Sequence, residues 1–275
     1  MRDEYTVSGV AAAVQVAKRL GLPHEDPELL HQRSNVLVRL GSVVARVPAT
    51  TGLVRPEPHD WLARDVAVSS FLTERGVRVV SPLSDPGPGP HFAAGHWVTL
   101  WHFTPHDPNH RFTASEVATS LHAVHVALRD YEGPLPSDGP LAETYRALDL
   151  WEHVLDGAAD RLRDEADRIA ATLPAGPAQA LHGDAHPGNL IATAAGPCWL
   201  DFEDTWRGPL AWDLGVLRGT FPEALDAYPA HPGPAALDPF ENLRKLFEVP
   251  WRFIVAQRFP DEIEAARECL ARYFA

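Results

Sequence analysis

The sequence predicts an α+β chain in which a small antiparallel sheet precedes a larger, mostly helical part. Short apolar runs over residues 29–48 are interrupted by Gly41-Ser42, which predicts paired strands joined by a turn. From Thr113 onward, apolar residues recur at helical spacing, and few strand signals follow. The chain has 275 residues, which is enough for two lobes that enclose a substantial core.

Periodicity and turn residues predict the individual elements in order. A first helix over residues 7–20 ends at Gly21-Leu22-Pro23, because glycine and a following proline are typical of a helix end. A second helix over residues 61–75 carries Asp65 within its apolar row, where a carboxylate needs a partner. Apolar stretches bounded by turn residues predict further strands over residues 77–83 and 96–103.

The second part of the chain is predicted to be helical for most of its length. A capping box at Thr113–Glu116 begins a helix that extends to about residue 128. Apolar stripes predict helices over residues 141–173 and 240–274, with breaks in the second region at Pro250 and Pro260. The proline-rich stretch 228–239 is expected to be a long loop.

The net charge of -13 is confined to the second part of the chain. Residues 1–103 hold 10 basic and 10 acidic residues, so of the 24 basic and 37 acidic residues in the chain, 14 and 27 lie in residues 104–275, a difference of -13. This excess argues against a nucleic-acid partner. It suits a cationic small molecule that is drawn to an acidic cleft, although a solvated acidic surface is the alternative. Candidate carboxylates for such a cleft are Glu248, Asp261 and Glu262.

Composition also limits the compartment. The only cysteines are Cys198 and Cys269, so neither a disulfide framework nor a four-cysteine zinc site is expected. No apolar run approaches the ~18 residues of a membrane helix, and the acidic start at Asp3-Glu4 differs from a secretory leader. We therefore expect a cytoplasmic monomer or dimer that does not bind membranes.

The stretch from His182 to Phe202 carries the chemistry. Asn189 follows Asp184 by five positions, and the pair Asp201-Phe202 begins twelve residues after Asn189. A kinase catalytic loop has the first spacing, and the metal-binding segment of kinases begins with the same Asp-Phe pair. Asp184 is expected to orient an acceptor hydroxyl and take its proton, whereas Asn189 and Asp201 offer the oxygen ligands that Mg²⁺ prefers.

The segments HGDAHPGNLI and LDFEDTWRGPLAWDLG resemble the aminoglycoside phosphotransferase and choline kinase family. The resemblance implies a protein-kinase-like, two-lobed fold that phosphorylates small molecules. Its N-lobe would span residues 1–103, with a leading helix, a nucleotide-covering sheet and a hinge strand. Its C-lobe would span residues 104–275, with the catalytic loop, the metal site and the acceptor pocket. ATP or GTP would be the donor, and Mg²⁺ would accompany it.

The resemblance also assigns nucleotide-binding residues to the first part of the chain. Ser34-Asn35 matches a Ser-Asn pair in the nucleotide-covering turn, although no Gly-x-Gly-x-x-Gly motif is present. Arg46 occupies the place of the strand cation that pairs with the phosphates, and its alternative is a surface arginine. Asp65 is expected to hold Arg46, unless it only borders the helix face. Adenine is expected on the hinge backbone between Trp101 and Phe103.

Two further positions follow from the same segments. Asp213 in Trp212-Asp213-Leu214-Gly215 is expected to cap a helix or to brace the catalytic loop through backbone N–H groups. Glu203 stands where protein kinases have glycine, so the conformational flip of regulated kinases is not expected.

The sequence thus predicts a phosphotransferase with an alcohol acceptor. An amine-bearing acceptor is expected, such as an aminoglycoside-type antibiotic, which would imply antibiotic resistance, or an amino sugar; choline- and homoserine-like alcohols remain open. One alternative is a metallohydrolase that uses His182, Asp184 and His186 as ligands, although it leaves the Asp-Phe segment unexplained. The other is a nucleotide-binding module without catalytic activity.

Overall fold

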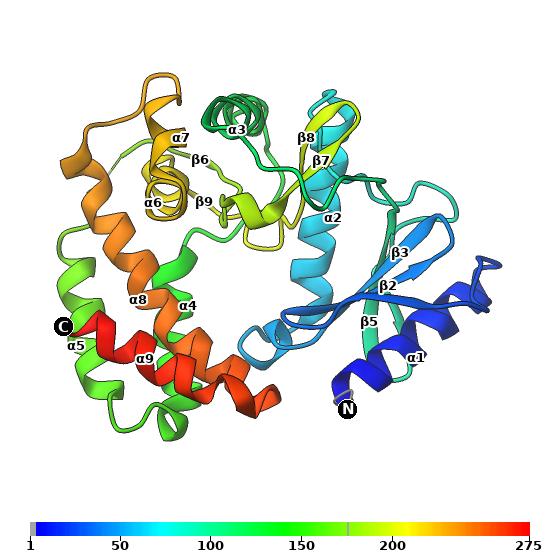
Figure 1. Cartoon of the computed structure of the whole chain (residues 1–275), viewed down its shortest axis with the longest axis horizontal. Coiled ribbons are helices and arrows are strands. Elements are labelled where there is room, and N and C mark those ends of the chain that lie inside the picture. Colours follow the sequence, from blue (N-terminus) through cyan, green and yellow to red (C-terminus); the bar gives the residue numbers. More distant parts are fainter. Residues whose placement is uncertain (1–3, 175) are drawn as a thin grey trace. The chain divides into compact units, whose positions relative to one another are not determined.

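The computed structural model describes residues 4–174 and 176–275, and the chain forms two compact units. The first unit comprises Met1–Arg111 and Leu190–Glu203, and the second comprises Phe112–Asn189 and Asp204–Ala275. The chain therefore returns to the first unit for residues 190–203. The lobe boundary predicted between residues 103 and 104 stays a prediction. The α+β class is confirmed, because a five-stranded antiparallel sheet is combined with many helices (Figure 1).

The first unit is built on this five-stranded sheet, whose strand order is β1-β2-β3-β5-β4. Its strands are β1 (Glu28–His31), β2 (Asn35–Leu40), β3 (Val43–Pro48), β4 (His91–Ala93) and β5 (His96–His102). Every neighbouring pair is antiparallel, with Val38 opposite Ala45 and Ala45 opposite Leu100. The tight β2–β3 turn uses Gly41 at a φ of +67°, a conformation that glycine adopts without strain.

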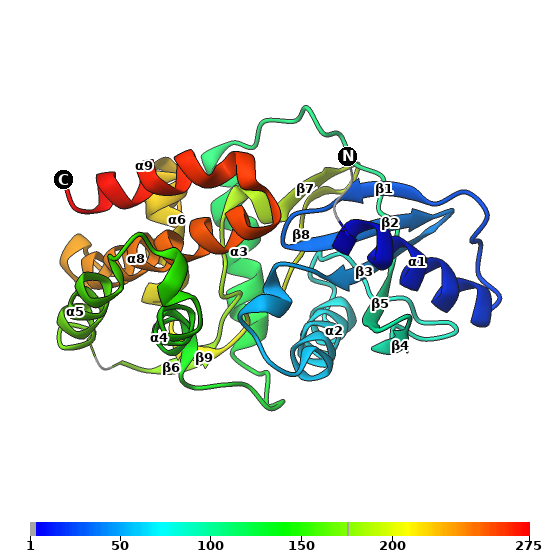
Figure 2. The same cartoon turned by 90° about the horizontal axis from the view of Figure 1, so that it is seen from below.

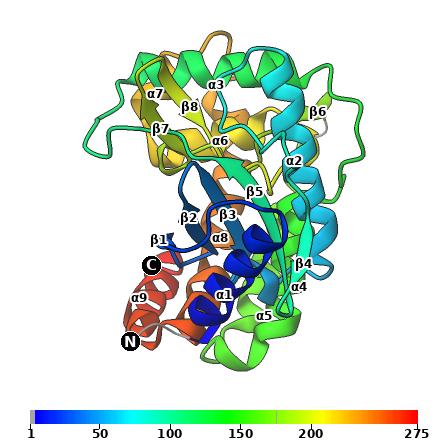
Figure 3. The ribbon, with the colours of Figure 1, turned by 90° about the vertical axis from the view of Figure 1, so that its right-hand side faces the viewer.

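The two faces of the sheet have different roles, because successive strand residues point to opposite sides. Helix α1 (Glu4–Arg19) covers one face, where Val36, Val38 and Ala45 join its buried alanines in one core cluster. Figure 3 shows α1 lying across β2 and β3. The alternating residues of the other face include Leu37, Val44, Arg46 and Trp101, which line a pocket. Asp65 of α2 (Pro58–Glu74) reaches Arg46 on this face.

The segment 190–203 is bound to the first unit by backbone hydrogen bonds. Its strands β7 (Leu190–Thr193) and β8 (Gly196–Trp199) form a hairpin. The Val80 N–H donates to the Trp199 carbonyl at 2.8 Å, and the Asp107 N–H donates to the Ala192 carbonyl at 2.9 Å. The strand predicted over residues 77–83 is wrong. Only isolated bridges at Val79 and Pro82 occur there, because residues 78–80 bond to Trp199 and residues 81–83 bond to β5.

The second unit is mostly helical. Its elements are α3 (Ala114–Leu128), α4 (Gly139–Trp151), α5 (Ala159–Ala170), α6 (Ala211–Thr220), α7 (Pro222–Asp226), α8 (Pro234–Arg258), α9 (Ile263–Tyr273) and the antiparallel ribbon of β6 (Ala178–Ala180) with β9 (Arg207–Pro209). Single 3₁₀ turns occupy η2 (Glu152–Val154), η3 (Pro187–Asn189) and η4 (Pro260–Glu262), while η1 (Thr51–Leu53) lies in the first unit. Helices α4, α5, α6 and α9 all pack against α8, and Figure 2 shows α9 alongside it.

Helix α8 corrects two of the predictions. It begins at Pro234, so the loop expected over residues 228–239 ends early, and proline is well suited to a first helical position. The break expected at Pro250 is also wrong, because α8 continues to Arg258. Pro250 is buried, and its packing offsets the hydrogen bond that proline cannot donate. A break does occur at Pro260, and the capping box at Thr113 and Glu116 is confirmed.

None of the helices in the described part of the chain combines the length and apolar character needed to span a lipid bilayer.

Candidate active site

A buried guanidinium in the first unit binds three carboxylates. Arg46 of β3 donates from Nη1 to Asp65 Oδ2 at 2.7 Å, and from Nη2 to Asp201 Oδ1 at 2.6 Å. Nη2 also forms a short hydrogen bond to Glu203 Oε2. Burial alone would lower the pKa of Arg46, but the three carboxylates hold this pKa above its ordinary value, so the guanidinium is always charged. The predicted pairing of Arg46 with Asp65 is confirmed.

Glu203 is the member of this cluster whose role the sequence did not reveal. It is 4% exposed, and its Oε1 accepts from Thr51 Oγ1 at 3.2 Å and lies 3.8 Å from Arg55 Nη1. The Asn35 carboxamide lies beside it, and with its oxygen turned toward Arg46 it accepts from Nη2 at 2.8 Å. The sequence feature that could have revealed this role is an acidic residue at the position where protein kinases have glycine.

Asp65 connects α2 to the Asp-Phe segment as well as to β3. Its Oδ1 accepts the Phe202 N–H at 3.0 Å, and its side chain is fully buried. Burial raises the pKa of Asp65 to about 6, while Arg46 acts in the opposite direction. Asp201 adopts a φ of +71°, a left-handed conformation that is unfavourable for residues other than glycine. These bonds therefore fix the position of Asp201 in the first unit.

A pocket of about 150 Å³ opens beside this cluster, on the sheet face opposite α1. Its lining is mainly apolar and consists of Leu30, Leu37, Val44, Val80, Trp101, Phe103, Ile191 and Leu200, together with Arg46, Asp201, His102, Thr104 and His106. An apolar slot that contains a fixed cation suits a flat ring attached to an anionic group. Trp101 and Phe103 thus line the pocket expected for adenine, and all of its lining residues belong to the first unit.

Two backbone N–H groups of the expected hinge, between Trp101 and Phe103, already donate hydrogen bonds within the protein. The His102 N–H donates to the Ser81 carbonyl at 3.0 Å, and the Phe103 N–H donates to the Ser42 carbonyl at 2.9 Å. The expected hydrogen bond between adenine and the hinge backbone stays a prediction, and it would have to use backbone groups other than these two N–H groups. Ser34 is exposed and is not among the lining residues of this pocket. Its carbonyl accepts from the Ala49 N–H at 3.2 Å, so it holds the turn before β2.

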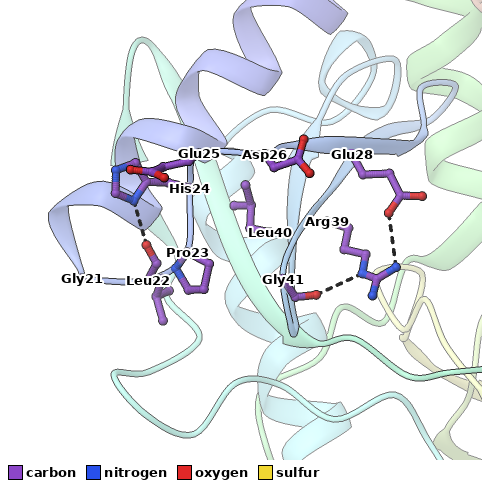
Figure 4. A pocket seen from close by; sticks show the side chains of 10 residues that line it. All are labelled: Gly21, Leu22, Pro23, His24, Glu25, Asp26, Glu28, Arg39, Leu40 and Gly41. Carbon is purple, nitrogen blue, oxygen red and sulfur yellow. Dashed lines mark hydrogen bonds and ion pairs between the residues drawn. The ribbon is translucent and has the colours of Figure 1, made fainter.

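A second pocket of the first unit, of about 690 Å³, has a mixed polar and apolar lining and lies between the α1–β1 connection and the β2–β3 turn (Figure 4). Arg39 forms an ion pair with Glu28 at 3.2 Å there, and its guanidinium lies 3.7 Å from the ring centre of Phe103. None of the predicted site residues lines this pocket.

In the second unit, a buried carboxylate fixes the backbone of the catalytic loop. Asp213 of α6 accepts the His182 N–H at 2.7 Å and the Gly183 N–H at 2.9 Å, which confirms the predicted bracing role. Its Oδ2 also lies 2.9 Å from Nε2 of His125, whose Nδ1 lies 2.9 Å from the Tyr228 hydroxyl. Since Asp213 can only accept, His125 must donate from Nε2 and, when neutral, accept from Tyr228.

Gly183 is required by the geometry of this loop. Its φ is +91°, and a Cβ at this position would overlap the Asp204 carbonyl oxygen. Its own carbonyl accepts from Trp212 Nε1 at 2.6 Å. The loop that leads into Asp184 is therefore fixed by hydrogen bonds on both sides of Gly183.

Asp184 is held by three side chains of the second unit. Asn189 Nδ2 donates to the Asp184 carbonyl at 2.9 Å and to its Oδ2 at 3.2 Å, and His186 Nε2 lies 3.2 Å from the same oxygen. Arg244 of α8 places Nη2 2.8 Å from Oδ1. Burial would raise the pKa of Asp184, but Arg244 and His186 outweigh it and hold this pKa well below its usual range. Arg244 belongs to no motif, so no local pattern pointed to it.

The two expected metal ligands belong to different units, Asn189 to the second and Asp201 to the first. The Asn189 nitrogen is engaged by Asp184, which leaves its amide oxygen for another partner. Asp201 binds Arg46 through Oδ1, which leaves Oδ2 as the oxygen that could bind a metal ion. An amide oxygen and a carboxylate oxygen fit the preference of Mg²⁺ for hard oxygen ligands.

The metallohydrolase alternative gains no support from the geometry. Among the described residues, no three histidine, cysteine, aspartate or glutamate side chains are grouped as metal ligands. His182 Nδ1 accepts the Asp184 N–H at 3.3 Å, which directs this nitrogen toward the backbone of its own loop.

A strand cation held by a helix carboxylate, an Asp-Phe segment and an aspartate–asparagine loop together define a kinase-type phosphotransferase. The profile of the phosphotransferase enzyme family (APH) matches residues 24–246, and the chain belongs to this family. The predicted family is thus confirmed, and the chain is an enzyme that phosphorylates a hydroxyl group of a small molecule. A search of curated proteins found no match.

Solved structures with the same fold confirm the predicted protein-kinase-like class. The amicoumacin kinase hAmiN, in complex with AMP-PNP, Ca²⁺ and Ami, matches with a TM-score of 0.73 at 12% identity, over 98% of this chain and 96% of that one. The spectinomycin phosphotransferase APH(9)-Ia, in complex with ADP and spectinomycin, has a TM-score of 0.66 at 11% identity, with coverage of 93% and 92%. The choline kinase LicA from Streptococcus pneumoniae has a TM-score of 0.60 at 14% identity, with coverage of 94% and 98%.

Proposed function

We propose that this enzyme transfers the γ-phosphoryl group of ATP or GTP to a hydroxyl of a small, amine-bearing acceptor. The observation that carries the nucleotide assignment is the position of Arg46. Its guanidinium is buried and permanently charged, and it lines an apolar pocket that suits a flat ring. Phosphoryl transfer depends mainly on positioning and charge neutralisation, which a fixed guanidinium provides. Complexes of the similar structures with AMP-PNP and ADP support this assignment.

Most of the predicted site residues then have a role in the reaction. Trp101 and Phe103 would cover the base, and Arg46, held by Asp65, would pair with the phosphates. Asp184 would orient the acceptor hydroxyl and accept its proton, which its ionised state permits. Asn189 and Asp201 would hold Mg²⁺. When bound, this ion neutralises the charge of the phosphate oxygens.

The acidic excess of residues 104–275 supports an acceptor with an amine, such as an aminoglycoside-type antibiotic or an amino sugar. The names of the similar structures indicate amicoumacin, spectinomycin and choline as acceptors of those proteins. An antibiotic acceptor would give the enzyme a role in resistance, and a choline- or homoserine-like alcohol is the alternative. Glu248, one of the candidate carboxylates, is already paired with Arg252 at 2.5 Å.

The test is a coupled assay of nucleotide consumption with ATP and GTP against hydroxylated amines, sugars and amino acids. Asp184→Asn should bind nucleotide normally and lose about 10²–10⁴-fold in kcat. Asp201→Ala and EDTA should each abolish turnover. Wild-type turnover of Asp184→Asn on the best acceptor would refute the role of this residue, and full activity in EDTA would refute the metal.

A further inference from the structure

The charge immediately next to the proposed catalytic aspartate is positive. Arg244 Nη2 lies 2.8 Å from Asp184 Oδ1, and Arg244 has no other ion-pair partner within the described parts of the chain. The two side chains are 25% and 19% exposed, so part of each reaches the protein surface. An acceptor hydroxyl that bonds to Asp184 therefore arrives beside a guanidinium.

The acidic residues that flank Arg244 on α8 do not neutralise it, because they have cations of their own. Glu241 pairs with Arg218 at 2.5 Å and with Lys245 at 2.6 Å. Glu248 pairs with Arg252 at 2.5 Å. The acids of α8 on either side of Arg244 are thus paired with other cations, and Arg244 and His186 are the basic groups that contact the Asp184 carboxylate.

The pairing of Arg244 with Asp184 is close but poorly directed. Asp184 Oδ1 is buried and has no hydrogen bond of acceptable geometry within the described residues, although Nη2 is near. The guanidinium carries five N–H donors, and a planar carboxylate can bind two of them at once. Phe247, one turn further along α8, lies with its ring centre 5.6 Å from the guanidinium and borders it with apolar surface.

We propose that Arg244 binds an anionic group of the acceptor, of the carboxylate class, close to the hydroxyl that is phosphorylated. In the free enzyme Asp184 occupies this guanidinium; a bound acceptor would bring its own anion to Arg244 and its hydroxyl to Asp184. This inference rests on the proposed function and narrows it. Combined with the proposed amine, it describes a hydroxylated amino acid or an amino sugar acid.

The experiment uses acceptors that differ only in this anion: L-homoserine against L-homoserine amide, and D-glycerate against D-glyceramide. They are assayed with the wild-type enzyme, with Arg244→Gln, and with Arg252→Gln as the matched control on the same helix. A charge-assisted contact predicts that the carboxylates exceed the amides by roughly 10- to 100-fold in kcat/KM. Arg244→Gln should remove this preference, and Arg252→Gln should retain it.

Calorimetric binding of the same four probes, with AMP-PNP present, provides a second measurement that does not require turnover. Carboxylate binding that is lost in Arg244→Gln supports the inference even if no probe is phosphorylated. If neither the probes nor the wider acceptor panel is phosphorylated, the proposed function fails by itself.

Several results would overturn the inference while leaving the kinase assignment intact. These are a preference for the amides, a carboxylate preference that survives in Arg244→Gln, and the absence of carboxylate binding to the wild-type enzyme. A uniform loss for all acceptors and for nucleotide hydrolysis in water would assign Arg244 to the transferred phosphoryl group instead, which also contradicts the inference.

Discussion

Replacement of Arg46 by alanine should destabilise the enzyme strongly, in addition to any effect on nucleotide binding. Arg46 is the shared partner of Asp65, Asp201 and Glu203, and the side chains of Asp65 and Glu203 are only 0% and 5% exposed. Without the guanidinium, Asp65 keeps the Phe202 N–H, and the partners that Glu203 keeps include Thr51 and the more distant Arg55. Both acids would then stay buried without the cation that they share.

The magnitude follows from the cost of breaking a buried ion pair on one side, which is about 3–5 kcal/mol. At about 2–4 °C of melting temperature per kcal/mol, the expected drop is about 6–20 °C. Arg46→Lys should lose less, because an ammonium keeps the charge but cannot match all three carboxylates. Asp65→Asn, added to Arg46→Ala, should recover part of the stability, since it removes one of the buried carboxylates that Arg46 binds.

The assay is thermal unfolding, measured with and without nucleotide so that the effect on folding is separated from the effect on nucleotide affinity. Arg39→Ala is the matched control, because Arg39 also forms an ion pair from the sheet but is 37% exposed. Exposed pairs contribute about 0–1 kcal/mol, so this control should hardly move. A melting temperature of Arg46→Ala within about 2 °C of the wild type, or additive effects of the Arg46 and Asp65 changes, would refute the cluster as a coupled unit.

Three more predictions concern the loop and the pocket. Asp213→Asn should cost about 1.5–3 kcal/mol in unfolding free energy and lower kcat, because a charged acceptor of loop N–H groups is lost; an unchanged denaturation midpoint would contradict this. Gly183→Ala should reduce kcat severely, since its Cβ would overlap the Asp204 carbonyl oxygen, and near-normal kinetics would exclude that contact. Val44→Phe should fill the pocket of about 150 Å³ and raise the nucleotide KM while acceptor KM stays constant; an unchanged nucleotide KM would mean that the base binds elsewhere.

Local patterns in the sequence predicted most of the first unit. The pairing of Arg46 with Asp65 was predicted from the resemblance, which pairs a strand cation with a helix acid, and from the place of Asp65 in the apolar row of its helix. The position of Asp213 relative to the catalytic loop followed from the resemblance in the same way. Ser34 shows the limit of that approach, because a matching dipeptide does not specify which side chain turns inward, and here Asn35 is the buried member.

Contacts between residues far apart in the sequence, and features that depend on tertiary packing, were harder to predict from the sequence. Arg244 reaches Asp184 from a helix 60 positions later, and nothing in its local sequence marks it. Pro250 illustrates a different limit: the local cost of an interior proline is offset by burial of its ring, which depends on tertiary packing. The strand predicted over residues 77–83 has the correct apolar composition, yet its hydrogen bonds are divided between partners from two different elements.

The return of residues 190–203 to the first unit has a consequence for how this chain is made. Asp201 and Glu203 supply two of the three carboxylates of Arg46, but they are synthesised long after the sheet. On a ribosome, the first unit therefore cannot complete its charge compensation until residue 203 has emerged, and by then all residues of α3, α4 and α5 have been synthesised. A graft or an expressed fragment of residues 1–111 would contain Arg46 with Asp65 alone, and it would need the hairpin 190–203 fused to it to reproduce the native electrostatics.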